Sequence, residues 1–140
     1  RAAELDNPFA KNAVENHKKV MAQFNEGVAL YPINKEKGIA IFRKLANDGL
    51  ADAQHRMGVN YYNIALGTKY DVDKRENFER AYTYFLLAAN QGLAISQYQV
   101  AVCLEQGRGI EKDLVEAKRW FQLAANQGHQ SAIDKLQNLM

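Results

Sequence analysis

Two stretches decide the fold of this 140-residue chain: FLLAANQG at residues 85–92 and FQLAANQG at residues 121–128. They share seven of eight letters at a distance of 36 residues. A weaker copy, FRKLANDG, occupies residues 42–49, which is 43 residues before the first. Repeats of this length are typical of stacked two-helix units, because one unit cannot bury its apolar face without neighbours.

The residues around each copy have the periodicity of a helix. In the best copy, the spacing i, i+3, i+4, i+7, i+8 places on one stripe Ala81, Tyr84, Phe85, Ala88 and Ala89. Each copy ends in glycine, which closes a helix in the left-handed conformation without a Cβ clash. We therefore expect helices that end just before Gly49, Gly92 and Gly128.

A second helix is expected within about three residues of each glycine, so that the chain forms antiparallel helix pairs. At the other helix ends, Asp113 with Glu116 and Asp73 with Glu76 have the spacing of an N-cap box. The seven additional residues of the first interval are placed in a long loop at residues 65–73.

Upstream of the repeats, residues 11–30 carry a further amphipathic pattern, with Val20, Phe24 and Val28 on one stripe. The sequence thus predicts an all-α protein, an α-solenoid of antiparallel helix pairs with about three repeats. Residues 1–34 are expected to hold an N-terminal capping helix, and residues 35–140 the solenoid.

The stretch at residues 104–132 closely resembles the Sel1-like repeat, a relative of the tetratricopeptide repeat. The resemblance rests on Gly107, Gly109, Asp113, Ala117, Trp120, Ala124, Ala125 and Gly128. It covers roughly residues 35–140, with Leu104 at a position where the family commonly has tyrosine. The resemblance implies a right-handed α-solenoid that serves as a protein-binding adaptor.

Composition excludes several classes of protein. The net charge of +2 is small and the basic residues are scattered, which does not favour DNA or an anionic membrane as partner. No apolar run is long enough to span a membrane. Cys103 is the single cysteine, so a disulfide framework is excluded.

No catalytic, metal or cofactor motif is predicted. GRGIEK at residues 107–112 lacks the ending of a phosphate loop and follows no strand. His17, His55 and His129 do not have metal-ligand spacing, and Cys103 lies between apolar residues, as a packed thiol does. We therefore expect no enzyme, no catalytic residue, no metal and no cofactor.

A partner is expected on the concave side, which the first helix of each pair lines in tetratricopeptide-like stacks. The candidate contact residues there are His55, Val59, Tyr62, Tyr98, Val102, Glu105, Asp134 and Asn138. The long loop, with Tyr70 in its middle, is a second candidate surface. Tyr62 and Tyr98 are predicted to be the anchors.

These expectations lead to a protein or peptide partner rather than nucleic acid, bound by an interaction scaffold that is bacterial and envelope-associated. The alternative is an immunity-type inhibitor of a toxin enzyme, and a weaker one is a hydrolase acting on β-lactam or peptidoglycan. The first residue is Arg1 rather than methionine, which is compatible with a removed secretion signal. A periplasmic or secreted location is expected rather than a cytoplasmic one, and the sequence does not predict the oligomeric state.

Overall fold

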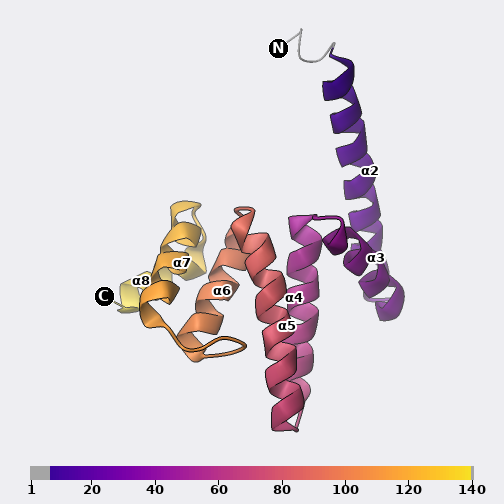
Figure 1. Cartoon of the computed structure of the whole chain (residues 1–140). Helices are drawn as coiled ribbons and strands as arrows, with labels where there is room; N and C mark the ends of the chain where they lie inside the picture. Colours follow the sequence, from indigo (N-terminus) through magenta and orange to yellow (C-terminus); the bar gives the residue numbers. More distant parts are fainter. Residues whose placement is uncertain (1–6, 140) are drawn as a thin grey trace. The chain divides into compact units, whose positions relative to one another are not determined.

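The computed structural model describes residues 7–139, and these residues form seven α-helices and no strand, which confirms the all-α prediction. The helices are labelled in Figure 1. Their bounds are α2 (Pro8–Leu30), α3 (Lys35–Asn47), α4 (Ala51–Gly67), α5 (Asp71–Asn90), α6 (Ala94–Gln106), α7 (Leu114–Asn126) and α8 (Gln130–Leu139). No helix within the described residues is long and apolar enough to cross a membrane.

The chain divides into two compact units, unit 1 (Arg1–Leu45) and unit 2 (Ala46–Met140). Unit 1 contains α2 and most of α3, and unit 2 contains α4 to α8. The sequence places its boundary at residue 34 instead. That boundary and the capping role of the first helix stay predictions.

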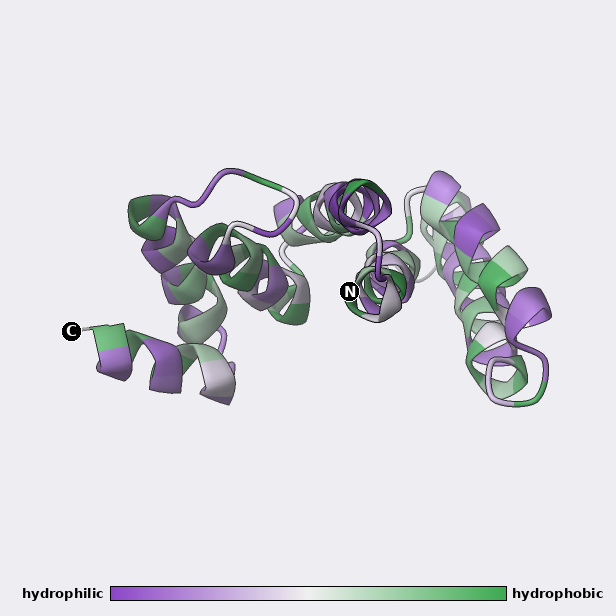
Figure 2. Cartoon of the chain, turned by 90° about the horizontal axis from the view of Figure 1, so that it is seen from below, coloured by the Kyte–Doolittle hydropathy of each residue, from purple (hydrophilic) through white to green (hydrophobic). Residues whose placement is uncertain are grey.

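In unit 2 each helix packs against the next one along the chain, from α4 to α8. Figure 1 shows α4 to α7 side by side with alternating direction. In Figure 2, hydrophobic green and hydrophilic purple bands alternate around them, as expected for helices that bury one side. The predicted stack of antiparallel helix pairs is therefore confirmed.

The terminal glycines close their helices as the sequence predicts. Gly49, Gly92 and Gly128 have φ values of 101°, 96° and 87°. After α5, the Gly92 amide donates to Ala89 and the Leu93 amide donates to Ala88, which is the hydrogen-bond pattern of a Schellman cap. The same pattern follows α7.

The repeated phenylalanine fills the space that a small residue leaves on the preceding helix. Phe85 is fully buried, and a Cβ built at Gly58 of α4 would lie 2.6 Å from its ring. Unit 1 has the same arrangement, because a Cβ at Gly27 of α2 would lie 2.9 Å from the ring of Phe42. The contact between α2 and α3 in unit 1 therefore resembles the contact within a repeat pair. The sequence predicts only a capping helix there.

The glutamine of the octapeptide joins successive pairs in unit 2. Gln91 donates to the Gly49 carbonyl at 2.9 Å and to the Gln54 side chain at 2.8 Å. In the next pair, Gln127 donates to the Gly92 carbonyl at 2.7 Å and to the Gln97 side chain at 3.0 Å. These repeated bonds satisfy carbonyls in the turns that follow α3 and α5, which have no partner within a helix. The octapeptide is thus a packing unit and a link between repeats.

The prediction of a long loop at residues 65–73 is wrong. The seven additional residues lengthen the two helices instead, because α4 and α5 have 17 and 20 residues whereas α6 and α7 have 13 each. Only residues 68–70 connect α4 to α5. Consequently Asp73 lies inside α5 and is not its N-cap, whereas Asp113 does cap α7 by accepting from the Glu116 amide.

Candidate functional site

Tyr62, one of the two predicted anchors, lies inside the contact between repeats. Its ring packs against Phe78 at 5.2 Å and Phe85 at 6.2 Å. Arg108, from the loop after α6, donates to the Tyr62 hydroxyl and places its guanidinium 5.6 Å from the ring centre. Tyr62 therefore connects the loop after α6 to the pair α4 and α5. Much of its side chain is covered by these contacts and is not accessible to a partner.

Tyr98, the other predicted anchor, occupies an equivalent place one repeat later. Its ring lies 5.6 Å from Phe121 and stacks on His129 at 4.8 Å. Both tyrosines are half-buried and pack against the core of unit 2. Alanine at either position is therefore expected to lower the thermal stability of the chain, because each substitution would remove packing against these rings.

His55 is also committed to an internal contact. Its Nδ1 lies 2.8 Å from the Ser96 hydroxyl of α6, and its ring lies 5.4 Å from Phe85. Burial, with a smaller contribution from Arg56, lowers the pKa of His55 to about 4 against the opposing effect of Asp52. His55 is therefore neutral at physiological pH, and protonation works against the folded state.

We expect acid to destabilise the fold through His55. Its unfolded pKa lies near 6.5 and its folded pKa near 4, so its contribution is complete above the first value and is lost as pH falls towards the second. Urea unfolding at pH 7 and at pH 4.5 should show a loss of about 2 kcal/mol from this group. The control is His55→Gln, which has no titrating ring; an identical pH dependence in both proteins would reject the assignment.

Three further predicted contact residues differ in accessibility. Val102 is 9% exposed and belongs to the core, which corrects its prediction as a partner contact. Val59 is half-buried and packs against the same core. Glu105 accepts from Lys135 of α8 at 2.9 Å, in an ion pair that joins α6 to α8.

Three predicted residues do face solvent. Tyr70 is 74% exposed at the start of α5, although it stands in a short turn rather than in a long loop. Asp134 and Asn138 are exposed on α8, where Asp134 accepts from Gln130 at 2.9 Å. Their contact with a partner stays a prediction. The structure thus does not gather the predicted set into one exposed surface.

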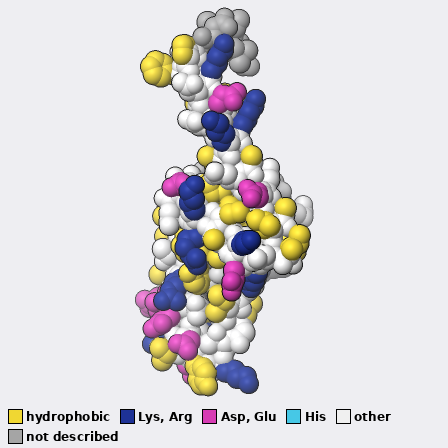
Figure 3. Space-filling model, turned by 90° about the vertical axis from the view of Figure 1, so that its right-hand side faces the viewer, with side chains coloured by type: hydrophobic (Ala, Val, Ile, Leu, Met, Phe, Trp, Pro, Cys, Tyr) yellow, Lys and Arg dark blue, Asp and Glu magenta, His cyan; other side chains and the backbone are white. Residues whose placement is uncertain are grey.

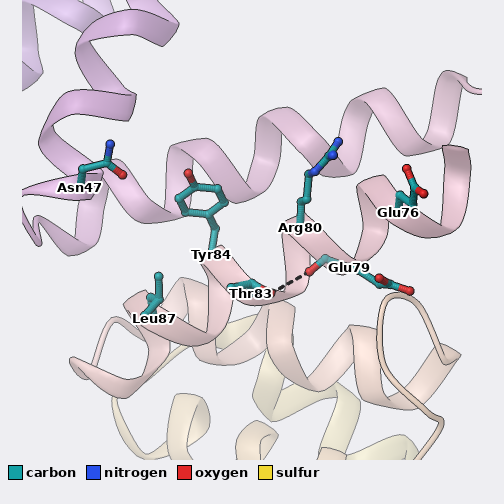
Figure 4. Close-up of a pocket in the computed structure, with 7 residues that line it drawn as sticks. All are labelled: Asn47, Glu76, Glu79, Arg80, Thr83, Tyr84 and Leu87. Carbon is teal, nitrogen blue, oxygen red and sulfur yellow. Dashed lines mark hydrogen bonds between the residues drawn. The ribbon is translucent and has the colours of Figure 1, made fainter.

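A groove that the sequence does not predict runs along α5 in unit 2 (Figure 4). It has a volume of about 530 Å³ and is lined by Asn47, Glu76, Glu79, Arg80, Thr83, Tyr84 and Leu87. Six of these residues follow the helical spacing of one face of α5. The sequence signal was therefore present, as the polar and aromatic stripe beside the buried one, but a solvated helix face has the same signal.

The aromatic part of this groove is fixed by stacking between α4 and α5. Tyr84 stacks on Tyr61 with ring centres 5.8 Å apart and planes 9° from parallel. The Arg80 guanidinium lies 5.8 Å from the Tyr61 ring, and Figure 4 shows Arg80 and Tyr84 pointing towards α4. Because these side chains are already ordered, less conformational entropy is lost when a partner binds.

The groove combines side chains that suit protein contact. Leu87 is 47% exposed at one end, and Glu76, Glu79 and Arg80 supply both signs of charge towards the other. Aromatic and arginine side chains are frequent anchors in protein interfaces, and paired charges around them set orientation. The groove is open and extended, as a surface for a peptide or a helix would be.

Nucleophilic chemistry at Cys103 is disfavoured by its surroundings. The thiol is fully buried in α6, and burial raises its pKa to about 12, against the smaller opposing effect of Arg108. The thiolate is the reactive form, so this cysteine stays protonated and inert at neutral pH. Within residues 7–139, no group of three His, Cys, Asp or Glu side chains is placed to hold a metal ion.

Comparison with known proteins finds one family. The model of the Sel1 repeat matches residues 51–93 and 94–129. In solved structures, the chain is similar to a Sel1 repeat protein from Oxalobacter formigenes, with a TM-score of 0.71 and 28% identity, over 91% of this chain and 94% of that one. It is also similar to c5321, a protective antigen of uropathogenic Escherichia coli, with a TM-score of 0.71 and 25% identity, over 86% of this chain and 26% of that one.

Two curated relatives are much longer proteins. DAP3-binding cell death enhancer 1 of Rattus norvegicus is 30% identical over 105 residues, which are 75% of this chain and 19% of the rat protein. Chitin synthase regulator SKT5 of Saccharomyces cerevisiae is 35% identical over 94 residues, which are 67% of this chain and 12% of the yeast protein. The chain thus spans a fifth or less of each relative.

Proposed function

The chain belongs to the Sel1 repeat family, and from that premise we propose that it is a non-enzymatic adaptor that binds a partner protein along α5. The observation that carries this proposal is the open groove with its stacked Tyr61 and Tyr84 and its exposed Leu87. It offers aromatic, apolar and charged groups over several helical turns, as a helix or an extended peptide requires.

The relatives support a role in contacts between proteins. The name of the rat protein states that it binds DAP3, and that of the yeast protein states that it regulates chitin synthase. Both names describe action on another protein. A bacterial envelope association and a periplasmic or secreted location stay predictions, which fractionation of the natural source would check.

The experiment begins with affinity capture of a partner by the full chain and identification by mass spectrometry. The groove is then tested with Arg80→Glu combined with Leu87→Ser, both at exposed positions. Since interface anchors contribute about 1–3 kcal/mol each, the affinity measured by calorimetry should fall by about tenfold or more. The circular dichroism melt should change little, because neither side chain is buried.

The matched control is Lys118→Glu combined with Val115→Ser on α7, which makes the same kinds of change at exposed positions outside the groove. Its affinity should equal that of the parent chain. An equal loss in both variants, or no loss in the groove variant, would place the partner elsewhere. A one-to-one complex that abolishes the partner's enzymatic activity would instead support an immunity-type inhibitor.

A further inference from the structure

The net positive charge of the described residues lies in one helical hairpin, although the basic residues themselves are scattered along the chain. Residues 7–45 contain seven basic and three acidic residues, a formal charge of +4, whereas residues 46–140 contain ten basic and eleven acidic residues, a charge of −1. We call α2 and the part of α3 within unit 1 the basic hairpin. Its cations are all exposed: Lys11, Lys18, Lys19, Lys35, Lys37, Arg43 and Lys44.

These cations have no acidic partners within residues 7–45. Both ion pairs of the described chain lie in unit 2, between Arg119 and Glu116 and between Lys135 and Glu105. In the hairpin, the contact of Lys35 is with the ring of Tyr31, whose centre lies 5.7 Å from Nζ. The excess of seven cations over three carboxylates leaves like charges that repel one another, so an anionic partner would reduce this repulsion as well as add attraction.

The cations follow the length of the hairpin. Lys11 and Lys18 are seven residues apart on α2, and Lys37 and Lys44 are seven residues apart on α3, so that each pair shares a helix face. With 23 residues, α2 is about 34 Å long. Figure 3 shows dark blue side chains following its first half, with an acidic side chain in magenta among them.

Apolar groups lie beside this charge. Phe9 is 84% exposed and Val14 is 50% exposed on the first half of α2. Nearer the turn, a groove of about 200 Å³ is lined by Gln23, Glu26, Ile41, Lys44 and Leu45. The hairpin therefore offers sites for both the carboxylates and the apolar side chains of a ligand.

We propose that the basic hairpin binds an acidic amphipathic segment of a partner protein. Glu15 stands between Lys11 and Lys18 on α2, and Glu36 stands between Lys35 and Lys37 on α3. These two carboxylates oppose a ligand that is anionic at every position, such as a nucleic acid. A protein segment can place uncharged side chains opposite the glutamates. A narrow groove between two helices also admits individual side chains, whereas a bilayer presents a plane.

This inference goes beyond the proposed function, because it concerns a second surface of the same protein-binding module. Variants of the hairpin leave every groove residue on α5 unchanged. A hairpin that fails its test therefore leaves the proposed binding along α5 untouched, and the reverse also holds.

The probe is a fluorescent synthetic peptide of about 20 residues, long enough for a helix of about 30 Å, with glutamates on one helical face and leucines on the other. Its binding to the full chain is measured by fluorescence anisotropy at low and at physiological salt. We expect binding that weakens as salt rises, because exposed ion pairs are screened. Phosphatidylserine vesicles and a mixed-sequence DNA duplex serve as the competing anions.

The test variant carries Lys18→Glu, Lys37→Glu and Lys44→Glu, and the matched control carries Lys69→Glu, Lys112→Glu and Lys118→Glu in unit 2. All six lysines are exposed, and both variants change the net charge equally. We expect the peptide affinity to fall by about tenfold or more in the hairpin variant and by less than about twofold in the control. If reversal lowers the melting temperature, glutamine at the same three positions replaces it.

Equal losses in the two variants would overturn the proposal, because net charge alone would then explain binding. Absence of peptide binding to the parent chain would overturn it as well. Tighter binding of vesicles or DNA than of the peptide, lost in the hairpin variant, would assign the surface to a membrane or to nucleic acid instead.

Discussion

Replacing Gly109 with alanine is expected to destabilise the chain by about 3 kcal/mol, from left-handed strain and overpacking together. Gly109 has a φ of 77° in the loop between α6 and α7, and a Cβ there would lie 2.2 Å from the Phe78 carbonyl oxygen of α5. The atoms that the Cβ would meet belong to the backbone of Phe78 and Glu79, and the position of the Cβ is fixed by its own backbone, so no side-chain rotation relieves the contact. Urea unfolding followed by circular dichroism gives the free energy directly.

Substitutions at two other glycines distinguish the cost of the left-handed backbone from the cost of the steric clash. Gly92 also has a positive φ, but nothing lies within 4 Å of its built Cβ, so Gly92→Ala should cost only about 1–2 kcal/mol. Gly67, the last residue of α4, has neither feature, so Gly67→Ala should be neutral or stabilising by up to about 1 kcal/mol. A loss at Gly109 no larger than that at Gly92 would mean that the loop does not pack against α5 in solution.

The role of Gly109 shows what the family resemblance contains physically. The sequence identifies Gly107 and Gly109 only as family positions, whereas the structure shows the second approaching Phe78 across the repeat interface. Arg108 stands between the two glycines, and its guanidinium lies 5.4 Å from the centre of the Phe78 ring. The glycines thus allow the loop to approach the preceding pair, and the arginine fastens it there.

Local features of the chain were predictable from the sequence. Helix caps depend on a few neighbouring residues, so the glycine stops and the Asp113 cap agree with the local pattern. Spacing alone does not decide, because Asp73 has the same spacing to Glu76 and lies inside α5. The place of the seven additional residues before Ala81 was not predictable, because a polar stretch with a glycine is compatible with a loop as well as with two longer helices. Packing of the longer α4 against α5 decides in favour of helix.

The burial of several candidate contact residues has a related reason. Periodicity indicates which helix face is apolar, but it does not indicate which neighbour covers the adjoining residues. Tyr62 and Tyr98 stand beside the packing stripe, and it is the loop or helix of the next repeat that covers them. The groove on α5 likewise depends on Tyr61, a residue of another helix.

The contact between Gly58 and Phe85 can be tested because the effect of Gly58→Ala on stability should change sign when the Phe85 ring is removed. Phe85→Ala alone should cost about 4 kcal/mol, because a fully buried ring is removed and a cavity remains. Gly58→Ala alone should be destabilising by about 1–2 kcal/mol, since its new Cβ meets that ring at 2.6 Å. Without the ring, the same substitution should stabilise α4 by about 1 kcal/mol through helix propensity.

The resulting coupling energy of about 2–3 kcal/mol is measured by a double-mutant cycle in urea. The same cycle at Gly27 and Phe42 should give a coupling of the same sign, because a Cβ at Gly27 lies 2.9 Å from that ring. Additive effects at Gly58 and Phe85 would contradict their contact. Additivity confined to Gly27 and Phe42 would show instead that α2 and α3 do not pack as a repeat pair, although their sequence carries the same phenylalanine.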